Sequence, residues 1–113
     1  MTVAPGAAAP SAGAPPSTAT VGVEEEFLLL DADGEAAPVA AQVIASLGNG
    51  LRAQQELMRH QVESATGVCR DLAELRAQLL ERRLLLAGAA AEHGACLVAV
   101  GTPPRSVCRG ARP

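Results

Sequence analysis

Aromatic residues are almost absent from this sequence of 113 residues: Phe27 is the only one, and Trp and Tyr do not occur. A core must therefore be built from Leu, Val and Ala, and because Ala contributes little apolar area we expect that core to be thin. The net charge is −3, and no aromatic residues are interleaved with basic ones. These features give no support to nucleic-acid binding.

Long apolar runs are also missing. No run of about 18 apolar residues occurs, so we expect no segment that spans a membrane. No Lys or Arg precedes an apolar segment near the N-terminus, which argues against a secretory signal. The three cysteines, Cys69, Cys96 and Cys108, are odd in number and widely spaced, a pattern typical of reduced thiols. We therefore expect a cytoplasmic protein in which Cys69 and Cys96 are buried apolar residues.

Composition divides the chain into three segments. Residues 1–19 are almost entirely Ala, Pro, Gly, Ser and Thr and carry no charged side chain, so we expect a disordered tail. Residues 20–104 contain the apolar periodicities and are expected to form one small domain. Residues 105–113 contain three Arg and no periodicity, so we expect an unstructured end.

The apolar pattern predicts the order strand, helix, strand, helix, strand, and therefore an α+β fold. The expected elements are strands at 20–30, 56–65 and 95–100 and helices at 38–47 and 69–93. Propensity alone also allows a helix from Leu51 to Arg59. Helical spacing in the second helix predicts that Leu72, Leu75 and Leu79 are buried, and the continuous apolar run of the last strand predicts a buried strand.

Three carboxylates interrupt the apolar run of the first strand. Because side chains alternate along a strand, Glu24 and Glu26 share one face, whereas Glu25 falls on the apolar face and requires an Arg partner or a bulge. Two carboxylates side by side repel each other, and a divalent hard ion would relieve this repulsion. Glu56 and Glu63, on the next extended segment, offer further oxygen ligands. The alternative is that these glutamates line a solvated sheet face.

Four segments together resemble one known family. Residues Thr20–Phe27, with the sequence TVGVEEEF, resemble the opening motif of the bacterial glutamate–cysteine ligase type 2 family, also called carboxylate–amine ligases. Residues Gln61–Cys69, QVESATGVC, resemble its second motif, Leu72–Arg83 is similar to the following helix, and Leu97–Pro104, LVAVGTPP, is similar to the strand and turn after it. Their order and spacing agree with the family over residues 20–104.

The resemblance implies a glutamine-synthetase-like fold, in which an antiparallel sheet with packed helices binds ATP, Mg²⁺ and an amino acid. The implied reaction activates a carboxylate of glutamate as an acyl phosphate, which the amine of cysteine then attacks, so the implied partners are small-molecule amino-acid substrates. By position, the resemblance makes Glu24, Glu26 and Glu63 metal ligands. Glu56 is a weaker candidate, because on a regular strand it faces away from Glu63.

Nothing that resembles the family follows Pro104, whereas family members continue well beyond this point. We therefore expect the N-terminal part of such an enzyme, without most of the active site and inactive by itself. Two alternatives stay open: a small helical interaction module that binds a partner through the apolar stripe of residues 68–90, and a non-functional product of a truncated or frameshifted gene. The acid and amine that are ligated and the oligomeric state also stay open.

Overall fold

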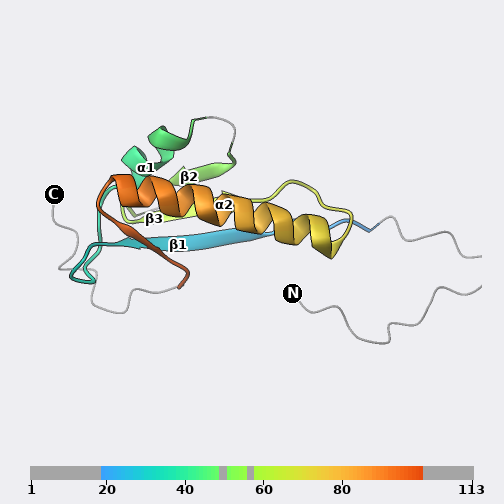
Figure 1. Ribbon diagram of the computed structural model, residues 1–113, viewed down its shortest axis with the longest axis horizontal. Coiled ribbons are helices and arrows are strands. Elements are labelled where there is room, and N and C mark those ends of the chain that lie inside the picture. Colours follow the sequence, from blue (N-terminus) through green and yellow to red (C-terminus); the bar gives the residue numbers. More distant parts are fainter. Residues whose placement is uncertain (1–18, 49–50, 56–57, 101–113) are drawn as a thin grey trace, which may run out of the picture.

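The computed structural model describes residues 19–48, 51–55 and 58–100. Within these residues two helices and four strands follow one another along the chain (Figure 1). They are β1 (Glu24–Leu30), α1 (Ala40–Leu47), β2 (Ala53–Gln55), β3 (Gln61–Ala65), α2 (Leu72–Glu92) and β4 (Cys96–Val98). Apart from Ala19, the predicted tail (residues 1–19) and the predicted end (residues 105–113) lie outside the described residues.

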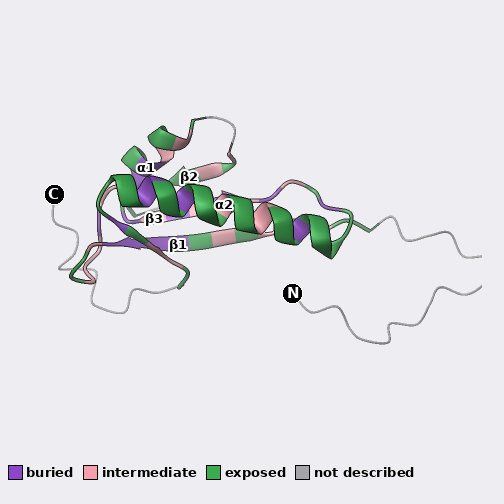
Figure 2. Cartoon of the chain, in the orientation of Figure 1, coloured by how far each residue is buried: buried purple, intermediate pink, exposed green. Residues whose placement is uncertain are grey.

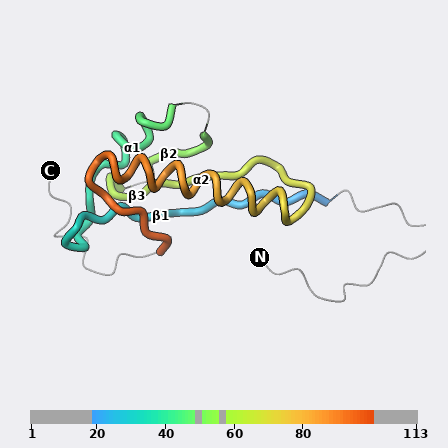
Figure 3. Tube along the Cα trace, viewed as in Figure 1, coloured from blue at the N-terminus to red at the C-terminus, as the bar shows by residue number. Residues whose placement is uncertain are grey.

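The four strands form one antiparallel sheet in the order β2-β3-β1-β4. This confirms the predicted α+β class with an antiparallel sheet. β1 is the longest strand and lies inside the sheet, paired with β3 on one side and with β4 on the other. α2 runs along one face of the sheet, and α1 packs near the C-terminal end of α2 (Figures 1 and 3).

The turn after β1 is stabilised by the side chain of Asp31 and by the backbone conformation of Gly34. Asp31 Oδ1 accepts hydrogen bonds from the main-chain N–H groups of Asp33 (2.9 Å) and Glu35 (3.0 Å). Gly34 has a φ of 77°, a conformation that favours glycine. The chain then returns to form a single antiparallel bridge between Leu30 and Ala36.

α2 begins and ends at signals that are visible in the sequence. Asp71 Oδ1 accepts a hydrogen bond from the Glu74 main-chain N–H (2.8 Å), and Glu74 Oε2 accepts one from the Arg70 main-chain N–H (2.9 Å). This is close to a capping box, which satisfies donors that the first helical turn leaves without partners. Gly94, with a φ of 73°, follows the last turn. The helix is thus slightly shorter than the predicted 69–93.

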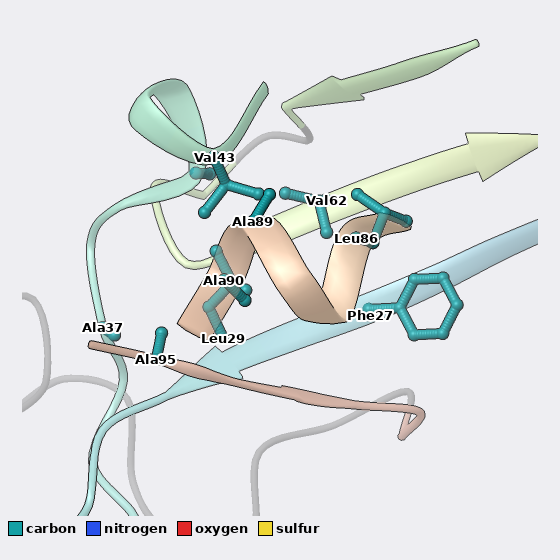
Figure 4. Close-up of a cluster of buried hydrophobic side chains, with 10 residues drawn as sticks. Phe27, Leu29, Ala37, Val43, Val62, Leu86, Ala89, Ala90 and Ala95 are labelled. Atoms are coloured by element: carbon teal, nitrogen blue, oxygen red, sulfur yellow. The ribbon is translucent and has the colours of Figure 1, made fainter. Parts of the chain in front are cut away.

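The apolar core lies between the sheet and the two helices (Figure 4). Phe27 and Leu29 of β1 and Val62 of β3 point toward α2 from the sheet. The buried cluster consists of Phe27, Leu29, Ala37, Ala40, Val43, Val62, Leu86, Ala89, Ala90 and Ala95. Half of its members are alanines, in agreement with the thin core that the composition predicts.

The prediction for the buried face of α2 was only partly correct. Leu75 is buried, but Leu79 is half-buried and Leu72 is exposed. The N-terminal half of α2 extends past the broad part of the sheet, so fewer side chains are available to cover it (Figure 2). The leucines that the sequence placed in one stripe therefore differ in burial along the helix.

Two further expectations were wrong. β4 is not a buried strand, because Cys96 is exposed and Leu97 and Val98 are half-buried. The reason is its position at the edge of the sheet, where only β1 pairs with it. The expected strand over 56–65 begins only at Gln61, after a turn in which the Gln61 N–H donates to the Met58 carbonyl (3.1 Å). The expected burial holds for Cys69, which is buried.

Candidate functional site

The pairing of β1 with β3 brings two of the predicted site residues together. Glu26 lies directly opposite Glu63 in the antiparallel register. The Leu29 N–H donates to the His60 carbonyl (2.8 Å), so these two residues form a hydrogen-bonded pair. Hydrogen-bonded and non-hydrogen-bonded pairs alternate along an antiparallel ladder. Glu26 and Glu63, three positions away, therefore form a non-hydrogen-bonded pair. Side chains are closest in such pairs, and like charges there are unfavourable. The sheet thus holds two carboxylates side by side.

Glu24 lies on the same face, opposite Ala65, one alternation away from Glu26. Gln54 of β2 lies opposite Glu63 on its other side. A surface pocket lies beside these strands. It is lined by Glu24, Arg52, Ala53, Gln54, Glu63 and Ala65. The pocket therefore combines two carboxylates, one amide and one guanidinium on the sheet face opposite α2.

Glu25 lies on the other face, as alternation predicts. Of the two alternatives, an Arg partner or a bulge, the structure has the Arg partner. Arg83 Nε of α2 lies 3.0 Å from Glu25 Oε1 and 3.1 Å from Oε2, and the Arg83 Nη2 donates to Oε2 as well. This hydrogen bonding raises the pKa of Arg83. The ion pair fixes α2 across β1 and removes Glu25 from the candidate site.

The segment that follows β3 is held by polar groups from α2 and from the start of β1. Arg82 Nε donates to the Ala65 carbonyl (2.7 Å), and Gln78 Oε1 accepts from the Gly67 N–H (2.8 Å). Thr66 Oγ1 accepts from the Val23 N–H (2.9 Å), and the Thr66 N–H donates to the Val23 carbonyl (2.9 Å). These bonds fix the backbone directly before Glu24 in β1 and shortly after Glu63 in β3.

Cys69, at the end of this segment, is a structural residue. Its main chain exchanges two hydrogen bonds with Val21, at 2.9 and 2.7 Å. Its thiol is buried and donates to the Gly67 carbonyl at 3.5 Å. Burial raises the pKa of the Cys69 thiol, and the nearby Glu74 raises it further. A thiol with a raised pKa is a poor nucleophile at neutral pH, because the thiolate is the reactive form.

The donors of the pocket fit Mg²⁺ in type but do not form a closed cage. Among residues 19–48, 51–55 and 58–100, no group of three or more His, Cys, Asp or Glu side chains is arranged to hold a metal ion. Mg²⁺ is commonly bound through one or two carboxylates together with water and substrate phosphates. Glu24 and Glu63 line the pocket, and Glu26, which does not line it, lies opposite Glu63 on the neighbouring strand. Glu56, the weaker candidate from the sequence, lies outside the described residues.

Arg52 and Gln54 were not anticipated as site residues. β2 is a strand of only three residues, and the sequence around it has helix-forming residues that hide the alternation. No sequence signal distinguishes these two residues from other polar surface positions. They reach the site only because β2 pairs with β3, opposite Ser64, Glu63 and Val62.

None of the helices in the described part of the chain has the length and apolar character needed to cross a membrane.

A profile of glutamate-cysteine ligase family 2 matches residues 20–112. The match therefore continues beyond Pro104, where we expected the resemblance to end. It includes every element of the sheet and both helices.

Curated relatives carry the same family name. A protein of Saccharopolyspora erythraea with the provisional name glutamate–cysteine ligase 2-2 is 50% identical over 95 residues, which is 78% of this chain and 24% of the relative. A protein of Salinispora arenicola, provisionally named glutamate–cysteine ligase 2, is 52% identical over 88 residues, or 75% of this chain and 23% of the relative. The chain thus spans about a quarter of the length of these relatives.

The paired carboxylates lie in the two segments that resemble the family's motifs, and the profile covers most of the chain. On these grounds the chain belongs to glutamate-cysteine ligase family 2.

Proposed function

We propose that this chain provides carboxylates for the Mg²⁺ and ATP site of a ligase that joins a carboxylate of glutamate to the amine of cysteine through an acyl phosphate. The observation that carries this proposal is the pairing of Glu26 with Glu63 on one sheet face, with Glu24 beside them. A divalent hard cation prefers oxygen ligands, and these carboxylates offer such ligands from two neighbouring strands. The proposal extends to a glutamine-synthetase-like fold, which the antiparallel sheet supports.

The residues have separable roles in this proposal. Mg²⁺ would neutralise phosphate charge and orient the transferred phosphoryl group. Glu26 and Glu63 would hold the ion from neighbouring strands, and Glu24 would contribute from the same face. Arg52, which lines the pocket with Glu24 and Glu63, would attract an anionic group of the substrate or nucleotide. Gln78 and Arg82 would keep the end of β3 in place.

We also propose that residues 1–113 bind the nucleotide without completing ligation. Phosphoryl transfer requires several positive groups around the phosphates, whereas Arg52 is the only basic residue that lines this pocket within the described part of the chain.

Two free thiols, Cys69 and Cys96, support the proposal that the protein works in a reducing compartment and hence in the cytoplasm.

The first test is calorimetric titration of the 113-residue chain with Mg²⁺ and ATP. We expect binding that requires Mg²⁺ and that Glu63→Gln weakens by about tenfold or more, because the change replaces a charged oxygen ligand with a neutral one. Glu81→Gln is the matched control: it removes one exposed carboxylate from α2, outside the pocket, and should leave the affinity unchanged.

Circular dichroism of both variants separates loss of binding from loss of folding. If the two variants weaken binding equally, or if binding does not depend on Mg²⁺, the assignment of Glu63 is wrong. Phosphate release in the presence of ATP, glutamate and cysteine should stay at background for the chain alone. Turnover above background would contradict the proposal that these residues do not complete ligation.

A further inference from the structure

Two side chains of α2 hold the segment at the end of β3 at matched spacing. Arg82 Nε donates to the Ala65 carbonyl (2.7 Å), and Gln78 Oε1 accepts from the Gly67 N–H (2.8 Å). Helical residues four positions apart lie on one face, about 6 Å apart along the axis, and extended residues two positions apart are separated by about 6.6 Å. The spacing of these two side chains thus matches the spacing of the backbone groups that they bind.

The Ala65 carbonyl belongs to the ladder between β2 and β3. Ala53 lies opposite Ser64, so Arg52 lies opposite Ala65, and the Ala65 N–H donates to the Arg52 carbonyl (2.9 Å). In a hydrogen-bonded antiparallel pair the two residues exchange two such bonds. Among the described residues, the second bond, from the Arg52 N–H to the Ala65 carbonyl, is not formed. Arg82 Nε donates to that carbonyl instead, so a side chain of α2 closes the ladder.

The Arg82 guanidinium is oriented for this role by its own helix. Its Nη1 lies 3.5 Å from the carbonyl of Gln78, one turn earlier in α2, and the residue is half-buried. A charged donor forms a stronger hydrogen bond than a neutral one. Arg82 can therefore replace the main-chain bond that the pairing of β2 with β3 lacks.

We propose that Arg82 is a positioning residue of the candidate site: it completes the pairing of β2 with β3 and thereby holds Arg52 at the pocket. β2 has only three residues and lies at the edge of the sheet, so each bond to β3 contributes much to its position. Arg52 and Ala65 both line the pocket. The effect of Arg82 on the pairing follows from contacts among the described residues, whereas the binding role of Arg52 rests on the proposed function.

Amide hydrogen exchange in the 113-residue chain, measured by NMR, tests the effect on the pairing. Arg82→Met removes the donor and keeps a side chain of similar length. We expect the Ala65 N–H to exchange at least about tenfold faster in this variant, while the Leu29 N–H, which donates to His60, keeps its rate. Arg82→Gln retains an N–H donor at the same distance along the side chain as Nε and should restore slow exchange. Arg76→Met makes the same change at an exposed position of α2 and should have no effect.

Three results of this experiment would overturn the proposal. They are an unchanged Ala65 rate in Arg82→Met, equal acceleration of the Ala65 and Leu29 amides, and equal Ala65 rates in Arg82→Gln and Arg82→Met. If Arg82→Met does not fold, the wild type decides instead. Its Arg82 Nε–H should exchange at least about tenfold more slowly than the Nε–H of the exposed Arg76, and equal rates would overturn the proposal.

Calorimetric titration with Mg²⁺ and ATP tests whether Arg82 acts through Arg52. Arg52→Met and Arg82→Met should each weaken binding at least about threefold, and the double variant should bind no more weakly than Arg52→Met alone, because the effects of coupled residues do not add. Additive losses would overturn the positioning role. If the wild type does not bind Mg²⁺ and ATP, the proposed function is wrong, and hydrogen exchange still decides whether Arg82 holds β2.

Discussion

Glu25 shows how a single residue can be ambiguous in the sequence and fully determined in the structure. Alternation placed its carboxylate among apolar residues, which left either an Arg partner or a bulge. The side chain of Glu25 is 16% exposed and that of Arg83 is 51% exposed, so the charge is partly removed from water and compensated by two-pronged hydrogen bonding. The partner lies far away in sequence, on a helix that crosses β1.

His60 gives a prediction at the same scale. Its side chain is buried, and burial lowers its pKa from the ordinary value of 6.5. The unfolded chain therefore binds a proton at a higher pH than the folded chain does. We expect the free energy of unfolding to be greatest above pH 6.5 and to fall as the pH drops toward the lowered pKa, by at most about 1.4 kcal/mol per pH unit from this residue.

Urea denaturation of the wild type and of His60→Gln, between about pH 7.5 and pH 5, measures this effect. The variant should have a smaller pH dependence in that range, because Gln does not titrate. If the slopes of the two proteins coincide, His60 is not the source of the dependence.

At the scale of elements, α2 has two different faces over the same stretch. Leu86 is fully buried in the core, whereas Leu84, two residues earlier, is 73% exposed. β1 is divided along its length instead: its N-terminal half carries the glutamates and its C-terminal half is buried (Figure 2). The sheet and helix together thus separate the acidic face from the apolar core.

This division predicts unequal costs for the same substitution. Leu86→Ala should lower the free energy of unfolding by about 2–5 kcal/mol, because it leaves a cavity in the core. Leu84→Ala should change it by no more than about 0.5 kcal/mol, because the side chain is largely in water. Urea denaturation of the two variants at one pH gives the comparison, and similar losses would contradict the packing described for α2.

At the scale of the whole molecule, stability depends on close approach of elements through alanine. Ala89 and Ala90 let α2 pack against the sheet next to Ala37, Ala40 and Ala95. Small side chains contribute little apolar area each, but they permit the tight packing that a larger residue would disturb. The core therefore has little tolerance for added volume.

Overpacking tests this view of the core. Ala90 is fully buried, so Ala90→Leu should lower the free energy of unfolding by about 1–3 kcal/mol. Ala87→Leu adds the same atoms at an exposed position of the same helix and should change stability by no more than about 0.5 kcal/mol. Thermal unfolding of both variants measures the difference, and a stabilised Ala90→Leu protein would show that the core contains unfilled space.

Much of the candidate site was predictable from local pattern. Alternation along β1 places Glu24 and Glu26 on one face, and the structure has them there. The position of Glu63 opposite Glu26 could not be obtained in this way, because a shift of the register by one residue would move Glu63 to the other face. Arg52 and Gln54 could not be foreseen for a related reason, since β2 becomes a strand through its pairing with β3.

The sequence by itself determined the local features: the turn at Asp31–Gly34, the ends of α2, the alternation in β1 and the likeness to the family. The first three depend on residues close together in the chain, whose conformational preferences act locally, and the likeness depends on the order and spacing of segments along the chain. The tertiary structure alone decided which carboxylates meet, which leucines of α2 are covered and that β4 lies at an exposed edge. These depend on contacts between distant segments, and packing between segments overrides local preference.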